Sequence, residues 1–442
     1  MRIDIGNRVI VHEPTRAVLS WANHALVFDN PQYQKAVALG KWTGNMEREI
    51  YLYAENGDDL ILPFGTLKDL WGLLPKGFSD YKTFFSPFQP LSMTGHINLY
   101  DYQQKALLSL LGGKNGVLEA PCGSGKTQIG LALIKAIGGK ALWLTHTKKL
   151  LSQSRERCER YFKGDFGEIT EGRVKIGKDI TFATVQTMSK IDPSVYRDAF
   201  SCVVVDECHH CVGTPTQVRE FYKIVSNCNC RYKYGMSATL TRSDGLIPAL
   251  FALIGPKLHT ITEEELHGKT IKAKHVRVDV NTYYEVESYS TEDGMLDYAR
   301  MIDAICSNEE RNSLIVRSAI VLKSTREKQL ILTARVSHAE ELAKRIPDSS
   351  LLVGKVSEKK RDYSASVLVA TYALAKEGLD IPELDTLHLA TPSKDPVTIK
   401  QSVGRIERNV EGKQQPIAYD YVDVSIPYCE RAYRRRKNIL RK

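Results

Sequence analysis

The sequence predicts an α/β protein with two tandem parallel sheets, each covered by helices, preceded by a small β-rich domain. Two series of short apolar segments, each followed by a helical or loop segment, predict the parallel sheets. Before Met93 the pattern is different, because apolar and polar residues alternate there as they do in antiparallel strands. A chain of 442 residues is also too long for one ordinary core, which favours more than one domain.

The first domain is expected over residues 1–93. Its segments RIDIGNRVIVHE (2–13) and EIYLYAENGDDLILPF (49–64) alternate apolar and polar residues, and the second contains the turn signal ENGDD. We therefore expect short antiparallel strands that include a hairpin. FGTLKDLWGLL (64–74) has helical spacing, and the proline-containing FFSPFQPLSM (84–93) is expected to link this domain to the next.

Two α/β domains are expected after the link, over residues 94–265 and 266–442. The strands of the first series are GVLEA, KALWLT, ITFATV, CVVVDE and YKYGMSA. A break falls near residues 255–273, and the strands of the second series are then QLILTA, SSLLVG, SVLVAT, TLHLAT and PIAYDYV. Strands that alternate with helices in this way are typical of parallel sheets covered on both faces.

Charge and composition narrow the class of protein. Lysine and arginine exceed aspartate and glutamate, giving a formal net charge of +9, which favours a polyanionic partner without identifying it. The first residues do not resemble a signal peptide and no apolar run is long enough to span a bilayer, so we expect a cytoplasmic protein that does not enter a membrane. The nine cysteines are irregularly spaced, which fits reduced thiols better than a disulfide framework.

A phosphate-binding loop is predicted where the strand GVLEA runs into PCGSGKTQIG and the helix IGLALIKAI. A tight glycine turn before a helix presents backbone N–H groups and the positive end of the helix dipole to a phosphate. Lys126 would reach the β- and γ-phosphates of ATP, and the Thr127 hydroxyl would hold Mg²⁺. Ala120 stands where the usual pattern has its first glycine. The alternative interpretation is a glycine turn with an exposed lysine.

Two adjacent carboxylates, Asp206 and Glu207, follow the wholly apolar strand CVVV. Open α/β sheets bind ligands at the carboxyl ends of their strands. Asp206 would bind the Mg²⁺ through its water shell, and Glu207 would orient and deprotonate the attacking water. The alternative, a solvated turn, is disfavoured by the phosphate loop upstream.

The segment QSVGRIERN (401–409) places Arg405 and Arg408 about one helical turn apart in the second α/β domain. Phosphoryl transfer spreads negative charge over the γ-phosphate oxygens, and an arginine from a distant segment stabilises that charge. We therefore expect the active site in a cleft between the two α/β domains. The alternative is that both arginines pair with surface carboxylates.

A zinc site is a weaker alternative. ECHHC and the later CNC offer thiols and imidazoles, but their spacing differs from that of a zinc finger or ribbon. The residues concerned are Cys208, His209, His210, Cys211, Cys228 and Cys230.

Taken together, the motifs resemble those of the superfamily 2 helicases and translocases, in the order found in that family. The resemblance covers roughly residues 99–422. It rests on LYDYQQKAL, APCGSGKT, LTHTKKLLSQ, ATVQTM, DECH, SAT, ILTARVSHAEELA, ATYALAKEGLDIP and QSVGRIER. It implies that both α/β domains are RecA-like and that the enzyme hydrolyses ATP with Mg²⁺.

The resemblance also implies residue roles. The residues implied to bind the nucleotide or metal, or to act in hydrolysis, are Gln103, at the adenine, with Gly123, Ser124, Gly125, Lys126, Thr127, Asp206, Glu207, Gln401, Arg405 and Arg408. Gly378 and Asp380 would couple the nucleotide state to DNA contact. His209, Ser237 and Thr239 would couple hydrolysis to the grip on the strand. The polar residues expected along the DNA backbone are Thr184, Gln186, Thr333, Arg335 and Thr371; helix capping is the alternative for these five.

Within the superfamily, LYDYQ, SATLTRSDG and ATPSKDPVTIKQSVGR look most like the XPB- and RecG-type translocases, and closest to the UvsW-type branch-migration helicases of bacteriophages. This resemblance implies a monomer that moves on duplex, forked or four-way-junction DNA in replication, recombination or repair, beside proteins of those processes. Residues 1–93 would then bind DNA. The alternatives are a restriction or defence motor, an RNA helicase, and a nucleic-acid-binding protein that uses nucleotide only as a switch. The basic C-terminal RAYRRRKNILRK would contact phosphates or form a solvated helix.

Overall fold

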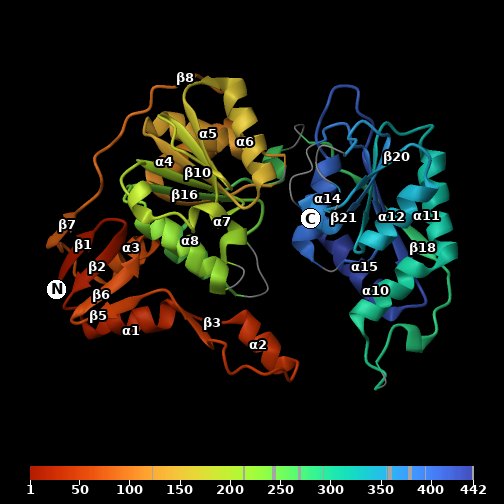
Figure 1. Ribbon diagram of the computed structural model, residues 1–442, viewed down its shortest axis with the longest axis horizontal. Helices are drawn as coiled ribbons and strands as arrows, with labels where there is room; N and C mark the ends of the chain where they lie inside the picture. The colour runs from red at the N-terminus through yellow and green to blue at the C-terminus, as the bar shows by residue number, and fades with distance from the viewer. Residues whose placement is uncertain are drawn as a thin grey trace. The chain divides into compact units, whose positions relative to one another are not determined.

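A computed structural model describes the chain except for residues 122, 213–214, 241–244, 267–269, 292, 355, 357–360, 377–380, 394 and 441–442. The chain divides into two compact units, Met1–Glu265 and Leu266–Lys442. Figure 1 shows the first unit in red to green and the second in green to blue.

The first unit begins with a small mixed sheet in the order β5-β6-β2-β1-β7. Its strands are β1 (Arg2–Ile5), β2 (Arg8–His12), β5 (Ala54–Asn56), β6 (Asp59–Pro63) and β7 (Tyr81–Thr83). The predicted hairpin is confirmed, because β5 and β6 pair antiparallel on either side of the ENGDD turn. The predicted helix is also present, as α3 (Leu67–Leu73) after the short 3-10 helix η1 (Phe64–Thr66).

Two helices in this region, α1 (Arg16–Ala25) and α2 (Pro31–Ala38), were not predicted, although both begin with clear capping signals. The Thr15 hydroxyl accepts a hydrogen bond from the Val18 N–H. Asn30 caps the second helix by accepting from the Gln32 N–H, and Pro31 occupies its first position. The ribbon of β3 (Val27–Asp29) and β4 (Glu49–Tyr51) flanks this second helix, and together they form an arm, residues 27–51 (Figure 1).

The first RecA-like sheet follows, in the order β13-β12-β14-β10-β15-β16-β9-β17. Its strands are β9 (Asn115–Glu119), β10 (Ala141–Thr145), β12 (Phe166–Thr170), β13 (Arg173–Lys175), β14 (Ile180–Thr184), β15 (Cys202–Asp206), β16 (Tyr232–Ser237) and β17 (Lys257–Thr260). All five predicted strands of the first series are confirmed. The pairings are parallel except that of β12 with β13, and the carboxyl ends of β9, β10, β14, β15 and β16 therefore share one edge.

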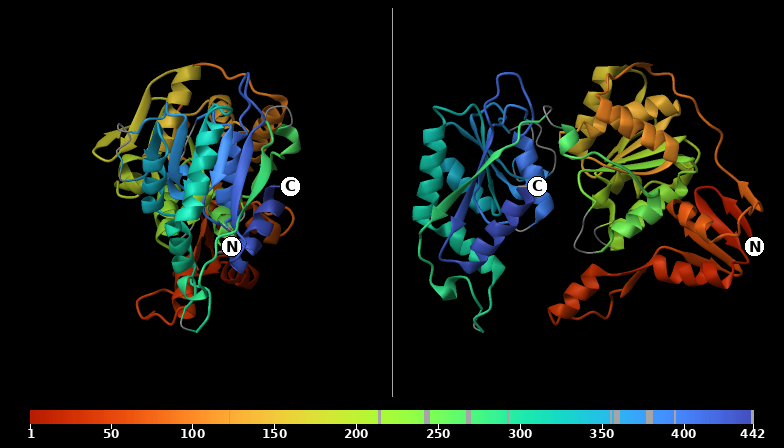
Figure 2. Two further views of the ribbon diagram at one scale, coloured as in Figure 1. Left: turned by 90° about the vertical axis from the view of Figure 1, so that its right-hand side faces the viewer. Right: turned by 180° about the vertical axis from the view of Figure 1, so that it is seen from behind.

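Helices cover both faces of this sheet (Figures 1 and 2). They are α4 (Asp101–Gly113), α5 (Lys126–Ile137), α6 (Lys148–Tyr161), α7 (Val185–Met188), α8 (Pro215–Asn227) and α9 (Ile247–Ile254), with the 3-10 helices η2 (Pro193–Val195) and η3 (Cys208–Val212). The 3-10 helix η4 (Glu264–Leu266) contains the boundary between the two units. The linking segment after β7 runs along the outside of the unit to β8 (Thr94–Gly95), which pairs with β11 (Phe162–Lys163) (Figure 2).

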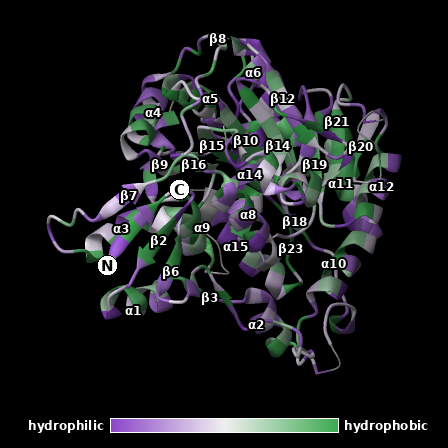
Figure 3. Ribbon diagram, turned by 60° about the vertical axis from the view of Figure 1, so that its left-hand side comes forward, coloured by the Kyte–Doolittle hydropathy of each residue, from purple (hydrophilic) through white to green (hydrophobic). Residues whose placement is uncertain are grey.

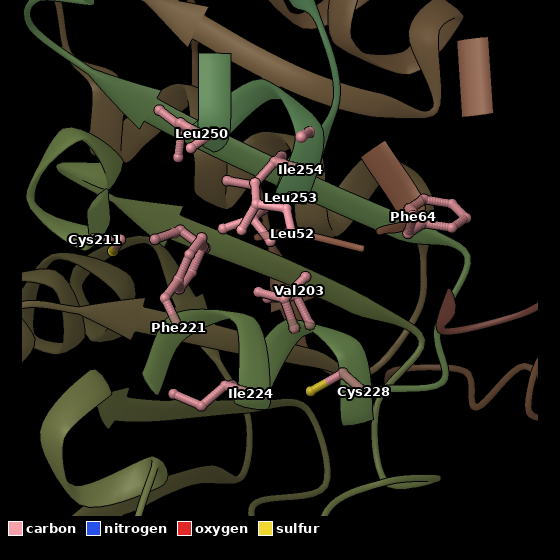
Figure 4. Close-up of a cluster of buried hydrophobic side chains, with 14 of the residues drawn as sticks. Leu52, Phe64, Val203, Cys211, Phe221, Ile224, Cys228, Leu250, Leu253 and Ile254 are labelled. Carbon is pink, nitrogen blue, oxygen red and sulfur yellow. The ribbon is translucent and has the colours of Figure 1, made fainter. Parts of the chain in front are cut away.

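A single hydrophobic core joins the small sheet to the first RecA-like sheet. Leu52 and Phe64 from the N-terminal region pack with Val203, Phe221 and Leu253, as Figure 4 shows. The contact is close enough that a Cβ on Gly65 would lie 2.4 Å from the Phe251 carbonyl oxygen. These residues make the N-terminal region part of one compact unit with the sheet.

The second unit contains a wholly parallel sheet in the order β18-β23-β22-β19-β21-β20. Its strands are β18 (Lys274–Val280), β19 (Gln329–Thr333), β20 (Ser349–Leu352), β21 (Val367–Thr371), β22 (Thr386–Leu389) and β23 (Ile417–Asp423). Its helices are η5 (Val286–Ser288), α10 (Tyr298–Ser307), α11 (Glu309–Leu322), α12 (Val336–Arg345), α13 (Tyr372–Lys376), α14 (Pro396–Ile406) and α15 (Pro427–Leu440). The second predicted series of strands is thus confirmed. The central strands are largely hydrophobic, whereas the helices carry both kinds of residue (Figure 3).

The basic C-terminal segment forms α15, and part of its charge is internal to the fold. Arg436 is buried, and its guanidinium donates to both Asp420 carboxylate oxygens at 2.7 Å. The Tyr433 ring packs beside the Arg277 guanidinium, 4.7 Å from ring centroid to Cζ. Among the described residues, we find no helix long and apolar enough to cross a membrane.

Candidate active site and its surroundings

The phosphate loop lies between β9 and α5 and has the conformation that its glycines allow. Gly123 and Gly125 have φ values of 83° and 79°, in the left-handed region that favours glycine. Gly125 is the N-cap of α5, so the helix begins at Lys126 and its first N–H groups face the loop. Ser124 is fully buried, and its hydroxyl has no hydrogen-bond partner within the described part of the chain.

The loop is held in place by α4. The Gln103 side chain donates to the Ser124 carbonyl oxygen at 2.8 Å and accepts from the Tyr100 N–H at 3.0 Å. The Tyr102 hydroxyl donates to the same carbonyl at 3.2 Å. Both ends of the buried Gln103 amide are therefore engaged with the backbone, and its predicted contact with adenine stays a prediction.

Lys126 and the two adjacent carboxylates meet at the carboxyl edge of the sheet. The Lys126 ammonium lies 3.0 Å from Glu207 Oε1. Glu207 follows the last residue of β15, Asp206, and has a φ of 48°, an uncommon backbone conformation for a residue with a side chain. Residues brought together here were predicted from separate motifs more than 75 positions apart in the chain.

Burial and charge shift the pKa values of these two carboxyls in opposite directions. Burial raises the pKa of Asp206, and the neighbouring Glu207 carboxylate raises it further. Burial alone would also raise the pKa of Glu207, but Lys126 and His209 outweigh it and lower that pKa below its ordinary value. Of the pair, Glu207 is thus the carboxyl that stays ionised more readily.

Arg157 of α6 also reaches this site, and sequence reasoning missed it. Its guanidinium donates to the Thr127 hydroxyl at 3.1 Å. Burial lowers the Arg157 pKa, and the Asp206 carboxylate counteracts that shift. No spacing rule links an arginine on α6 to the phosphate loop, because the contact depends on how α6 packs beside α5.

A chain of polar contacts connects Glu207 to the end of the neighbouring strand β16. His209 Nδ1 lies 3.4 Å from Glu207 Oε2 and 2.7 Å from the Ser237 hydroxyl oxygen. That hydroxyl donates to the Thr239 carbonyl at 2.7 Å and accepts from the Thr239 N–H at 3.2 Å. These three residues, His209, Ser237 and Thr239, were predicted to couple hydrolysis to strand grip.

A second set of contacts runs from the same carboxylates toward β10 and β14. The His210 ring packs against His209 with centroids 4.0 Å apart, and His146 stacks on His210 at 5.0 Å. The Gln186 amide lies 3.3 Å from His146 Nδ1. Gln186 is exposed, so this predicted nucleic-acid-binding residue is connected to the nucleotide site through imidazole rings.

The other predicted backbone-binding residues make internal contacts. Thr184 Oγ1 donates to Thr187 Oγ1 at 3.0 Å, and Thr371 Oγ1 accepts from the Leu374 N–H at 3.4 Å. Thr333 is fully buried, with its hydroxyl 2.7 Å from His338 Nδ1. Arg335 donates to Asp303 at 2.6 Å.

In the second unit, the other predicted hydrolysis residues lie on or just after α14. Gln401 is buried and Arg405 is half-buried on the helix, while Arg408 follows it in an isolated bridge with Thr270. The Lys413 ammonium donates to the Arg408 carbonyl at 2.8 Å. The predicted Gly378 and Asp380 lie outside the described residues.

The residues present fit Mg²⁺ and a nucleotide phosphate. Hydroxyl and carboxylate oxygens, from Thr127 and Asp206, are the ligands that Mg²⁺ prefers. The unpartnered Ser124 hydroxyl and the loop N–H groups suit phosphate oxygens. A Cβ on Gly125 would lie 2.3 Å from Gln103 Nε2, so only glycine keeps this loop closed.

The cysteines considered for zinc lie in the hydrophobic core. Cys208, Cys211, Cys228 and Cys230 are buried, and burial raises the pKa of each thiol. Within the described ranges, no three His, Cys, Asp or Glu side chains are grouped so as to hold a metal ion.

Comparison with known proteins finds similarity to helicases. The family "Type III restriction enzyme, res subunit" matches residues 96–242. A protein named putative ATP-dependent RNA helicase L396, from Acanthamoeba polyphaga mimivirus, is 25% identical over 410 residues, which are 88% of this chain and 76% of that protein. The ATP-dependent DNA helicase uvsW of Enterobacteria phage T4 is 23% identical over 373 residues, which are 78% of this chain and 72% of that protein.

Among solved structures, S. cerevisiae Dbp5 bound to RNA and ADP BeF3 has a TM-score of 0.58 at 15% identity, covering 78% of this chain and 88% of that chain. That likeness confirms the predicted fold of two RecA-like domains. Residues 96–242 carry a helicase domain of the res-subunit type, and the named helicases that match most of the chain support an ATP-hydrolysing helicase of superfamily 2. The similarity to uvsW is consistent with a superfamily 2 helicase close to the UvsW branch.

Proposed function

We propose that the protein is an ATP-driven DNA translocase that acts on duplex or branched DNA, as in fork remodelling or branch migration. The observation that carries this proposal is the joined site of the first unit. There the phosphate loop, the Asp206–Glu207 pair and the Ser237–Thr239 turn are connected by direct contacts. A site whose parts are in direct contact can hydrolyse ATP and can also change the conformation of segments outside the site when the bound nucleotide changes.

Hydrolysis would begin when the ion pair of Lys126 and Glu207 separates. The ammonium would turn to the β- and γ-phosphates, and Thr127 and Asp206 would hold Mg²⁺, which neutralises phosphate charge. Without Lys126 beside it, Glu207 loses the cation that lowers its pKa and becomes a better base for the attacking water. Lys126 would thus keep Glu207 paired until a nucleotide arrives.

Arg405 and Arg408 of the second unit would stabilise the negative charge that develops on the γ-phosphate, with Gln401 orienting the water. We expect Arg408→Ala to lower the hydrolysis rate by about 10³-fold or more, the range seen when such an arginine is absent. ATP binding, measured by equilibrium dialysis, should change much less. Loss of binding equal to the loss of rate would instead assign Arg408 a structural role.

The N-terminal region is proposed to contact DNA through the arm of residues 27–51. Four apolar side chains near its tip are exposed: Val37, Leu39, Trp42 and Met46. Trp42 is 74% exposed, which is unusual for the largest side chain unless it has a partner. Lys41 precedes it directly, and Lys35 lies on α2 of the same arm. Aromatic stacking on unpaired bases together with cationic attraction to phosphates is the chemistry these residues offer.

RNA is the second candidate substrate, because the mimivirus relative that matches most of both chains is named an RNA helicase. The res-subunit family name supports a third candidate, the motor of a restriction or defence system. A nucleotide switch without turnover is a further alternative. Glu207 argues against it, because a switch does not require a base that activates water.

The experiment that tests the proposal is steady-state ATP hydrolysis with Mg²⁺ and no polymer, single-stranded DNA, duplex DNA, a four-way junction or single-stranded RNA. Glu207→Gln is the inactive control. Strong stimulation by duplex or junction DNA is the expected result. Stimulation by RNA alone would assign the protein to RNA, and turnover that no polymer stimulates would contradict the proposal.

A further inference from the structure

A separate cavity of about 510 Å³ lies in the first unit, between the small N-terminal sheet and the segments around residues 197 and 227–229. Its walls come from the hairpin of β1 and β2, the segment after β7, the segment after η2 and the end of α8. Its volume lies in the range of small-molecule and nucleotide sites. Residues of the nucleotide site described above do not line this cavity.

The walls are fixed relative to one another by backbone contacts. The Phe84 N–H donates to the Ile5 carbonyl at 2.8 Å, and the Ser86 N–H donates to the Asn229 carbonyl at 3.0 Å. The Asn229 N–H in turn donates to the Arg197 carbonyl at 2.9 Å. The Asn7 side chain is hydrogen-bonded to the Ser226 carbonyl. The cavity is therefore formed before any ligand arrives.

Three buried polar atoms without hydrogen-bond partners in the described chain belong to residues that line this cavity. They are the acceptors Asp4 Oδ1 and Asn229 Oδ1 and the donor Arg8 Nε. Unsatisfied buried polar atoms each cost free energy, so their concentration around one cavity indicates a polar ligand. A ligand edge that carries both an amino group and an acceptor would satisfy them.

The remaining lining residues specify the rest of the ligand. The Phe84 ring is 54% exposed and offers a flat apolar face. Arg197 is exposed and brings a guanidinium suited to a phosphate. The Asp4 charge is offset within the fold, because His12 Nε2 lies 3.1 Å from its Oδ2 and Arg2 Nε lies 3.5 Å from its Oδ1.

We propose that this cavity binds one nucleotide, with an amino-bearing base against Asp4, Arg8 and Asn229, its face on Phe84 and its phosphate on Arg197. The ligand chemistry is that of a nucleoside monophosphate, supplied by an unpaired nucleotide of a nucleic-acid strand or by a free nucleotide. The inference rests on the proposed function, to which it adds a second nucleic-acid contact outside the ATP site.

The test uses the full chain with excess ADP and Mg²⁺, so that the phosphate loop is occupied. Fluorescently labelled d(C)12 and d(T)12 are compared by anisotropy, and free dCMP and dTMP by calorimetry. Cytosine has an exocyclic amino group and thymine does not, so we expect the cytosine probe to bind about fivefold tighter or more, as one hydrogen bond provides. If both d(C)12 and free dCMP are preferred over their thymine counterparts, the cavity binds nucleotides from a strand and from solution. If only d(C)12 is preferred, the cavity binds a nucleotide of a strand.

The variants Phe84→Ala and Arg197→Ala should each weaken the cytosine probe about fivefold or more, because they remove the stacking face and the phosphate contact. Arg173→Ala, on the exposed strand β13, is the matched control and should bind as the unchanged chain does. ATP hydrolysis without polymer should stay unchanged in all three variants, because none lies in the ATP site.

The inference is overturned if neither cytosine probe is preferred, or if Phe84→Ala and Arg197→Ala behave like Arg173→Ala while DNA still stimulates hydrolysis. If no polymer binds the unchanged chain or stimulates its ATP hydrolysis, the proposed function fails. Calorimetry with dCMP then decides whether the cavity binds a nucleotide. Binding of dCMP that depends on Phe84 would then support the cavity as a free-nucleotide site, and no binding would reject it.

Discussion

At the residue scale, the adjacent carboxylates and the lysine beside them could be predicted, whereas the Arg157 contact and the position of Gln103 could not. Lys126, Asp206 and Glu207 sit in short motifs whose chemistry is local in sequence, and the structure brings them within contact distance. Arg157 and the loop-holding role of Gln103 depend on helix packing across the unit, which no short pattern records. The three buried polar atoms that lack a hydrogen bond at the cavity beside the N-terminal sheet could not be predicted from the sequence, for the same reason.

Ser237 provides a test of coupling at this scale. Its hydroxyl lies between His209 Nδ1 and the Thr239 backbone, so Ser237→Ala interrupts the path from Glu207 to the end of β16. We expect the ratio of DNA-stimulated to unstimulated hydrolysis to fall by at least about fivefold, the lower end of ordinary coupling free energies. The measurement is ATP turnover with and without duplex DNA.

The matched control is Ser152→Ala, which removes an exposed hydroxyl on α6 that donates to the Lys148 carbonyl of the same helix. It should leave the ratio unchanged. An unaltered ratio in Ser237→Ala would show that the signal does not pass through this hydroxyl.

At the scale of elements, the alternation of apolar strands with helices predicted ten strands, five in each RecA-like sheet. The strands that were missed lie at sheet edges or next to them, such as β17 and β18, where charged residues interrupt the apolar pattern. The missed α1 and α2 are short, although the caps at Thr15 and Asn30 were readable from the sequence.

Adding a single methyl group at Gly125 tests whether the conformation of the loop between β9 and α5 is required for ATP binding. Gly125→Ala places a Cβ 2.3 Å from Gln103 Nε2 at a φ of 79°, a conformation that costs other residues about 1–2 kcal/mol. Since Gln103 must move, the loop loses its tie to α4, and we expect ATP binding to weaken about tenfold or more, as 1.4 kcal/mol implies. Binding can be followed with a fluorescent ATP analogue.

Gly112→Ala, near the end of α4, adds the same methyl group where nothing lies within 4 Å. It should leave ATP affinity unchanged and stabilise the helix by up to about 1 kcal/mol. Equal affinities for the two variants would contradict the role given to Gly125.

At the scale of the whole molecule, each unit has its own core and its own response to pH. His388 is fully buried in the second unit, with Nε2 2.9 Å from Gln329 Oε1 and Nδ1 3.0 Å from the Tyr421 hydroxyl. Burial lowers its pKa to about 3, and burial likewise lowers that of His338 to about 3.

These depressed values predict that the second unit loses stability in acid. Between the folded pKa of about 3 and the ordinary value of 6.5, the unfolded chain binds protons that the folded chain does not. The stabilisation is complete above pH 6.5 and is lost as pH falls, by about 2 kcal/mol per histidine at pH 5.

Denaturation curves at pH 5 and pH 7.5 can isolate this effect, because all four tryptophans precede residue 144 and report on the first unit. An unfolding transition that appears in circular dichroism but not in tryptophan fluorescence therefore belongs to the second unit. His388→Gln should reduce its pH dependence, whereas His24→Gln, exposed on α1, should not. An equal pH dependence in His388→Gln would contradict the assignment.

The central claim is that this chain converts ATP hydrolysis into movement along duplex DNA. A triplex displacement assay tests it most directly, because a short third strand is released only when a motor passes through the duplex beneath it. We predict ATP-dependent release by the unchanged chain and none by Glu207→Gln. Stimulated ATP hydrolysis without release of the third strand would contradict the claim and leave a nucleotide-driven switch in its place.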